Sequence, residues 1–112
     1  MKTIKVKRDF SQTPGPRYID EGEFSGELFR KDFLFKEVSD AISQNYKLLI
    51  DLDGTAGYGT SFLEETFGGL IRENGLKYED IVSHIEIKSV DEDYLIEDIQ
   101  QYLKDARDGK KI

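Results

Sequence analysis

Cysteine is absent from the sequence, and histidine occurs once, as His84. Without cysteine the chain can form no disulfide and offers no thiolate metal ligand and no cysteine nucleophile. One histidine also excludes the zinc sites that are built from several histidines. We interpret His84 as a surface residue rather than a metal ligand or a catalytic base, and we expect neither a metal site nor a cofactor.

Long apolar runs are also missing, and acidic residues outnumber basic ones. No apolar stretch approaches the roughly 18 residues of a membrane-spanning helix, and no signal or transit sequence is recognisable at the start. The formal net charge of −7 disfavours binding to nucleic-acid phosphates and to anionic membrane surfaces. The sequence therefore predicts a cytoplasmic protein whose partners include neither nucleic acid nor membrane.

Hydrophobic residues alternate between the two-residue period of strands and the 3.6-residue period of helices. Strands are expected at 1–7, 47–53 and 85–88, a short extended piece at 17–19, and helices at 26–44, 61–74 and 91–107. Because 47–53 is dense in Leu and Ile, we expect a central strand that is covered on both faces. This order predicts a single α/β domain over 1–112, with a mixed, mostly parallel sheet of about four strands and about three main helices.

Two aspartates follow the expected central strand, in the string Asp51-Leu52-Asp53-Gly54-Thr55. This string resembles the Asp-x-Asp-Gly-Thr motif of haloacid-dehalogenase-type phosphatases. The resemblance implies that Asp51 is a nucleophile, that Asp53 is an acid/base, and that Mg²⁺ bridges them to a phosphate. In that family the motif belongs to the first strand, whereas here a strand and a helix precede it. The alternative is that Asp53 caps or turns the loop while Gly54 adopts a positive φ.

Three longer segments carry a second resemblance, which extends over most of the chain. They are Thr13-Pro-Gly-Pro-Arg-Tyr18, Glu21-Gly-Glu-Phe-Ser-Gly-Glu-Leu-Phe-Arg30 and the stretch from Asp53 to Arg72. Together they look like a bacterial family of STAS-like domains of unknown function, distantly similar to anti-sigma-factor antagonists. The resemblance implies an α/β fold and a non-enzymatic regulatory module that binds a protein partner. In the classical antagonists that partner is a GHKL-type ATP-binding kinase, and phosphorylation of one Ser or Thr changes the binding.

The classical phosphoacceptor lies just after the central strand, at the N-terminus of the next helix. By position, the resemblance implies Thr60 as the phosphoacceptor, with Ser61 beside it, although Gly59 replaces the classical Asp. The alternative is that the hydroxyls only cap the helix, since Ser61 and Glu64 have the spacing of a capping box. A phosphate here would be favoured by the helix N-terminus and repelled by Glu64 and Glu65.

Partner contacts are expected around this segment and on the first long helix. The candidate partner-binding residues are Arg17, Phe29, Arg30, Phe33, Asp53, Tyr58, Glu64 and Glu65. The alternatives are that segment 14–24 covers the two phenylalanines and that the arginines pair with carboxylates such as Asp20, Glu21 or Asp53. Gly68 and Gly69 each destabilise a helix by roughly 1 kcal/mol relative to alanine. We expect this cost to be offset by close packing of the helix backbone on the sheet or by close approach of a partner. A further alternative is a subunit of a larger assembly without a switch of its own.

Overall fold

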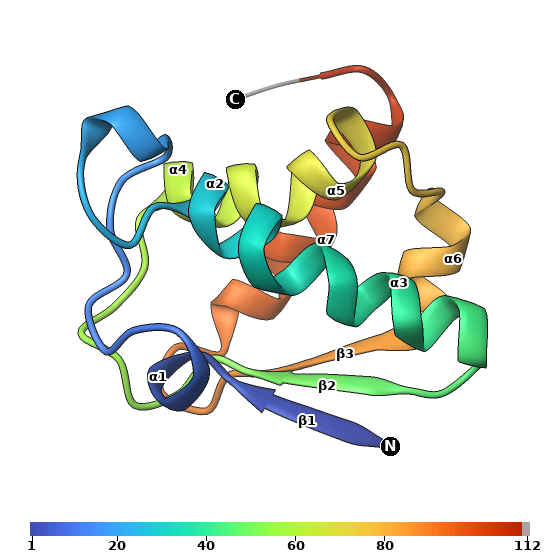
Figure 1. Ribbon diagram of the computed structural model, residues 1–112, viewed down its shortest axis with the longest axis horizontal. Helices are drawn as coiled ribbons and strands as arrows, with labels where there is room; N and C mark the ends of the chain where they lie inside the picture. Colours follow the sequence, from blue (N-terminus) through green and yellow to red (C-terminus); the bar gives the residue numbers. More distant parts are fainter. Residues whose placement is uncertain (111–112) are drawn as a thin grey trace.

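The computed structural model describes residues 1–110, and its sheet has three parallel strands (Figure 1). They are β1 (Lys2–Lys5), β2 (Leu48–Asp51) and β3 (Ile85–Lys88), with β2 in the middle. The expected mixed sheet of about four strands is therefore corrected, since three strands pair within residues 1–110 and both pairs are parallel. The piece expected to be extended at 17–19 instead leads into a 3₁₀ turn, η1 (Ile19–Glu21).

Two of the helices that connect the strands contain a wider, π-helical segment. The first long helix consists of α2 (Gly26–Phe29), the π segment η2 (Arg30–Leu34) and α3 (Phe35–Gln44). The second consists of α4 (Thr60–Leu63), the π segment η3 (Glu64–Gly68) and α5 (Gly69–Arg72). The other helices are α1 (Val6–Asp9), α6 (Tyr78–His84) and α7 (Tyr94–Arg107). With each long run counted once, residues 1–110 contain five helices, four of them with seven or more residues.

The first long helix has the bounds that the sequence predicts. Ser25 is its N-cap, and the Ser25 hydroxyl oxygen accepts a hydrogen bond of 3.0 Å from the backbone N–H of Leu28. The helix ends at Gln44, and its C-cap, Asn45, adopts a φ of 54° in the left-handed region that asparagine tolerates. The predictions of a helix over 26–44 and of a strand over 85–88 are therefore confirmed.

The long helices lie on one face of the sheet (Figure 1). On that face Ile4, Leu48 and Ile50 are at most 2% exposed. The alternate residues point to the opposite face, where Glu86 is exposed and Leu49 is partly exposed. The prediction that the central strand is covered on both faces is wrong, because the helices pack against one another above one face and leave the second one open.

The core lies between the covered face of the sheet and the helices. Its largest fully buried side chains include Phe29, Leu34, Phe62, Phe67, Leu70 and Ile99. None of the helices within residues 1–110 combines the length and the apolar character needed to cross a membrane. The carboxyl end of β2 leads directly into the loop before α4, which is the place where open α/β sheets usually carry their sites.

Candidate functional site

Asp51 and Asp53 both bind backbone N–H groups at the carboxyl end of β2. Asp51 is 7% exposed, and its Oδ1 accepts a hydrogen bond of 2.9 Å from the backbone N–H of Asp53. Asp53 in turn accepts bonds from the N–H groups of Asp91 (2.9 Å) and Val90 (2.8 Å), and these bonds hold the pKa of Asp53 below its usual range. Asp51 therefore fixes the turn after β2, and Asp53 ties that loop to the loop after β3, in agreement with the alternative that Asp53 caps or turns the loop.

The loop between β2 and α4 is fixed at two further points. Gly54 adopts a φ of +87°, and its backbone N–H donates to the Asp91 carboxylate at 3.0 Å. The Tyr58 hydroxyl donates to the Leu52 carbonyl at 2.7 Å, and burial raises the pKa of Tyr58 to about 12. Tyr58 also packs against Phe62, with ring centroids 5.8 Å apart. These hydrogen bonds and this ring contact hold the loop in one conformation against the rest of the domain.

Thr60 and Ser61 are exposed at the start of α4. The N-cap of this helix is Gly59, which provides no side-chain hydrogen bond, so the predicted capping box of Ser61 and Glu64 is wrong. The physical reason is that the helix begins at Thr60 and that arginines engage the Glu64 carboxylate. The Thr60 side chain lies near the Tyr102 side chain of α7. Within residues 1–110, the Ser61 side chain has no hydrogen-bond partner and faces solvent.

Glu64 and Glu65 are buried in η3, where they are 1% and 3% exposed. Glu64 pairs with Arg17 and with Arg72, the latter at 2.8 Å. Glu65 pairs with Arg30 at 2.8 Å. Burial acts to raise the pKa of Glu64, but hydrogen bonds from Arg72 and Arg17 outweigh it and leave the pKa lowered. We call these five side chains the Arg–Glu network.

Gly68 and Gly69 make room for the Arg–Glu network inside the second long helix. A Cβ at Gly68 would collide with the Glu64 carboxylate, and a Cβ at Gly69 would collide with the Arg30 guanidinium. The expected packing of these glycines on the sheet is therefore corrected, because they face buried charged side chains of their own and of the first long helix.

His84 links the end of α6 to the end of α3. Its ring nitrogens lie 2.7 Å from the Asp80 carbonyl and 3.0 Å from the Asn45 side-chain oxygen. The ring is partly exposed. Among the described residues, no group of three or more histidine, aspartate or glutamate side chains is arranged to hold a metal ion.

A comparison with family models matches residues 25–95 to the STAS-like domain of unknown function (DUF4325). The chain belongs to this family. No curated protein and no solved structure gives a significant match to the chain. The match covers both long helices, β2 and β3, so it includes the loop, the start of α4 and most of the Arg–Glu network.

Four of the expected partner-binding residues of this STAS-like domain are buried. Phe29 is 1% exposed and packs against Phe10, with ring centroids 4.8 Å apart. Arg30 is 3% exposed and, with Glu64 and Glu65, belongs to the Arg–Glu network. The expectation that these four side chains form a contact surface is corrected, because in this conformation they contact the protein's own core.

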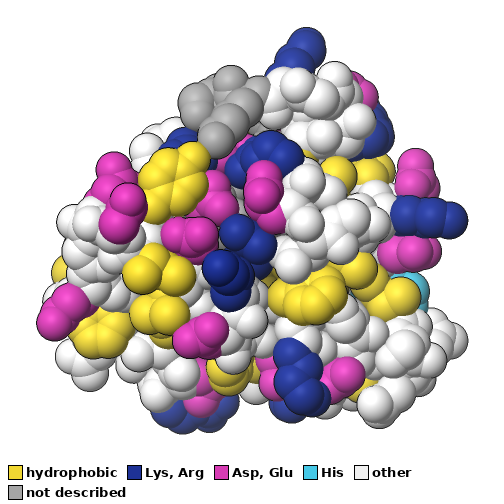
Figure 2. Space-filling model, turned by 45° about the horizontal axis from the view of Figure 1, so that its top comes forward, with side chains coloured by type: hydrophobic (Ala, Val, Ile, Leu, Met, Phe, Trp, Pro, Cys, Tyr) yellow, Lys and Arg dark blue, Asp and Glu magenta, His cyan; other side chains and the backbone are white. Residues whose placement is uncertain are grey.

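The remaining candidates lie nearer the surface. Asp53, Tyr58, Phe33 and Arg17 are partly exposed, whereas Thr60 and Ser61 are exposed. Phe33 stacks on Phe29, with ring centroids 5.9 Å apart. On the face viewed in Figure 2, acidic and basic side chains are interleaved rather than gathered into a patch of one sign. The two most exposed candidates, Thr60 and Ser61, therefore lie at the start of α4.

Sequence reasoning missed Arg72 of the Arg–Glu network and Asn74, which binds Arg30. Arg72 binds Glu64 with two nitrogens, at 2.8 and 3.1 Å, and Asn74 accepts a hydrogen bond of 2.8 Å from Arg30. A signal for Arg72 was present, because Glu64, Gly68 and Arg72 follow one another at intervals of four and so lie on one helical face. No comparable signal points to Asn74.

Proposed function

We propose that this STAS-like domain is a non-enzymatic regulatory module that binds a protein partner through the start of α4 and the loop before it. The observation that carries the proposal is the exposure of Thr60 and Ser61 at the start of α4, directly after a loop that is fixed to the loop after β3. The acidic groups that suggested phosphate chemistry, Asp51 and Asp53, are engaged by backbone N–H groups. This engagement favours the regulatory module over a magnesium-dependent enzyme.

The proposed switch is phosphorylation of Ser61 or Thr60. Gly59 supplies no side-chain cap, so the first backbone N–H groups of the helix are available to an added phosphate. Phosphorylation adds about −1.5 to −2 charges. The sequence suggests repulsion from Glu64 and Glu65, but both carboxylates are paired with arginines. The Arg–Glu network therefore lowers the electrostatic cost of a phosphate at this helix start.

The partner that we propose is an ATP-binding protein kinase of the GHKL type. This follows from membership of a STAS-like family together with the resemblance to anti-sigma-factor antagonists. Such a kinase would recognise the helix start and modify one of its hydroxyls, so binding and modification would use the same surface.

Co-purification from native lysate tests the proposed function. We expect the wild-type chain to retain a specific ATP-binding partner and Ser61→Glu or Thr60→Glu to reduce its recovery at least about tenfold, because about 1.4 kcal/mol of lost binding has that effect. Ser43→Glu, at an exposed hydroxyl in α3, serves as the matched control and should retain the partner. Mass spectrometry of the native protein should find phosphate on Ser61 or Thr60. Failure to recover a specific partner, together with unmodified Ser61 and Thr60, would contradict the proposal.

A further inference from the structure

The strand β3 forms an edge of the sheet and has one unpaired side. The Lys88 carbonyl accepts a hydrogen bond of 2.9 Å from the Leu52 backbone N–H, so the peptide groups of Lys88 face β2. Because these groups alternate along a strand, those of Glu86 also face β2, while those of Ile85 and Ile87 face away from the sheet. The free side of β3 is therefore a row of unpaired N–H and C=O groups, which is a template for another strand.

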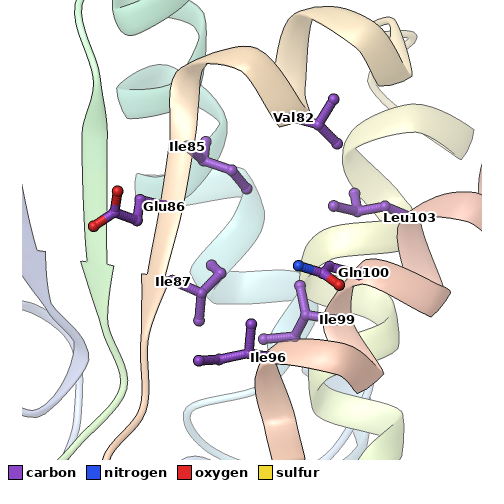
Figure 3. Close-up of a pocket in the computed structure, with 8 residues that line it drawn as sticks. All are labelled: Val82, Ile85, Glu86, Ile87, Ile96, Ile99, Gln100 and Leu103. Carbon is purple, nitrogen blue, oxygen red and sulfur yellow. The ribbon is translucent and has the colours of Figure 1, made fainter. Parts of the chain in front are cut away.

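An apolar groove lies beside this edge. It has a volume of about 210 Å³ and is lined by Val82, Ile85, Glu86, Ile87, Ile96, Ile99, Gln100 and Leu103. Figure 3 shows Ile85 and Ile87 pointing toward α7, while Glu86 points away from the groove. Three of the six large hydrophobic residues that are exposed in the described chain lie close to β3 in the sequence, namely Val82 (40%), Val90 (75%) and Tyr94 (57%). Exposed apolar groups beside an unpaired strand mark a surface that a partner can cover.

The sequence of β3 is complementary to itself when two copies run antiparallel. With Ile87 opposite Ile87 of a second copy, Glu86 lies opposite Lys88 and Lys88 lies opposite Glu86, which places opposite charges together on the open face of the sheet. Ile87 is then a hydrogen-bonded pair, as the outward direction of its peptide groups requires, and Glu86 and Lys88 form the non-bonded pairs in which side chains approach most closely. The alternative register, with Glu86 opposite Glu86, brings like charges together.

We propose that this protein forms a symmetric homodimer in which the β3 strands of two copies pair antiparallel about Ile87. The two sheets of three strands then become one sheet of six. The two-fold arrangement also brings Val90 of one copy toward the Val82 end of the other, which covers exposed apolar surface on both. This dimer uses a surface other than the start of α4, so its test is independent of the proposed phosphorylation.

Charge exchange at the two outer positions of β3 tests the dimer. Sedimentation equilibrium over a range of concentrations should show that the wild-type chain is a dimer. Glu86→Lys or Lys88→Glu alone should weaken it about tenfold or more, because each puts two like-charge pairs in place of two attractive ones. The double variant Glu86→Lys/Lys88→Glu should recover the dimer to within about threefold, since the pairs are attractive again. Lys36→Glu in α3 changes the net charge as Lys88→Glu does and should leave the dimer unaffected.

Cross-linking determines the register, and the absence of cysteine from the chain makes this test clean. Paired positions 86 and 88 would have Cα atoms about 4.5 Å apart, within disulfide range, whereas position 86 would be about 7–8 Å from its own copy. Oxidation should therefore cross-link a mixture of Glu86→Cys and Lys88→Cys chains but neither variant alone. A wild-type chain that is monomeric at every concentration, a double charge variant as weak as the single ones, or efficient cross-linking of Glu86→Cys alone would overturn the proposal.

Discussion

At the scale of single residues, Glu64 and Glu65 are charged side chains that the fold buries at a cost in free energy. Neighbouring carboxylates are both buried, and removing a charged group from water costs several kcal/mol even after the protein relaxes. The guanidinium groups of Arg17, Arg30 and Arg72 offset this cost because each pairs with at least one of the two carboxylates. Removal of one carboxylate would leave three guanidinium groups to share the single carboxylate that remains.

We therefore expect Glu64→Gln to lower the free energy of unfolding by about 3 kcal/mol, the loss typical of a broken buried ion pair. Arg17 and Arg72 would both lose their nearest carboxylate and keep the more distant Glu65, at 3.6 and 3.4 Å. Urea unfolding followed by circular dichroism measures the change. The control is Glu73→Gln, whose side chain is 54% exposed and lies 3.5 Å from Arg72. It should change stability by less than about 0.5 kcal/mol, as surface pairs usually do. Equal losses in both variants would contradict a special role for Glu64.

At the scale of helices, α2 and α4 approach each other along their backbones. A Cβ at Gly26 would lie 2.5 Å from the Phe62 carbonyl oxygen and 3.0 Å from the Thr66 hydroxyl. That hydroxyl donates to the Phe62 carbonyl at 2.7 Å. Since a backbone carbonyl cannot move aside as a flexible side chain can, the absence of a side chain at Gly26 determines the spacing of the two helices.

Gly26→Ala should accordingly destabilise the protein by about 1–3 kcal/mol, as overpacking of a tight contact does. Thermal unfolding at one fixed pH measures the effect. Gly59→Ala is the matched control, because no atom lies within 4 Å of a Cβ at that position and its φ is −81°. It should change stability by less than about 0.5 kcal/mol. A wild-type melting temperature for Gly26→Ala would show that the helices can separate without cost.

Hydrophobic periodicity predicted the helix over 26–44 and the strand over 85–88, because these signals are local. The π segments could not be predicted in this way. In η3 all five residues from Glu64 to Gly68 are buried. The burial of the two glutamates depends on ion pairs with arginines from distant parts of the chain. The capping box at Ser61 was a wrong prediction for a related reason, since one partner of Glu64 in the folded state is Arg17, which lies 47 positions away in the sequence.

At the scale of the whole molecule, the sequence predicted an α/β fold and the position of the exposed hydroxyls after the central strand. It did not predict that the sheet is open on one face, because a run such as Leu48-Leu49-Ile50 is compatible with coverage on either one or both sides. Nor could it tell which charged residues are buried. Arg30 and Glu65 are 35 positions apart, and their pairing arises only when the two long helices pack together.

The response of the whole molecule to acid follows from carboxyl groups held in their charged form. The pKa of Asp9 is lowered by a hydrogen bond from Arg8, that of Asp53 by backbone N–H groups, and that of Asp108 by a hydrogen bond from Arg107. The pKa of Glu64 is lowered although burial opposes it. In acid the unfolded chain therefore binds more protons at these groups than the folded chain, so stability rises with pH.

This stabilisation is complete above the pKa of about 4 that such groups have in an unfolded chain, and it is lost as the pH falls through the lower folded-state values. We expect the urea midpoint to fall steadily from about pH 5 to about pH 2.5, and Glu64→Gln to show a shallower fall because it lacks one of the groups. The opposing effect is relief of repulsion, since acid neutralises the excess negative charge of a chain with a net charge of −7. A midpoint that rises on acidification would show that this relief outweighs the loss of the bonded carboxylates.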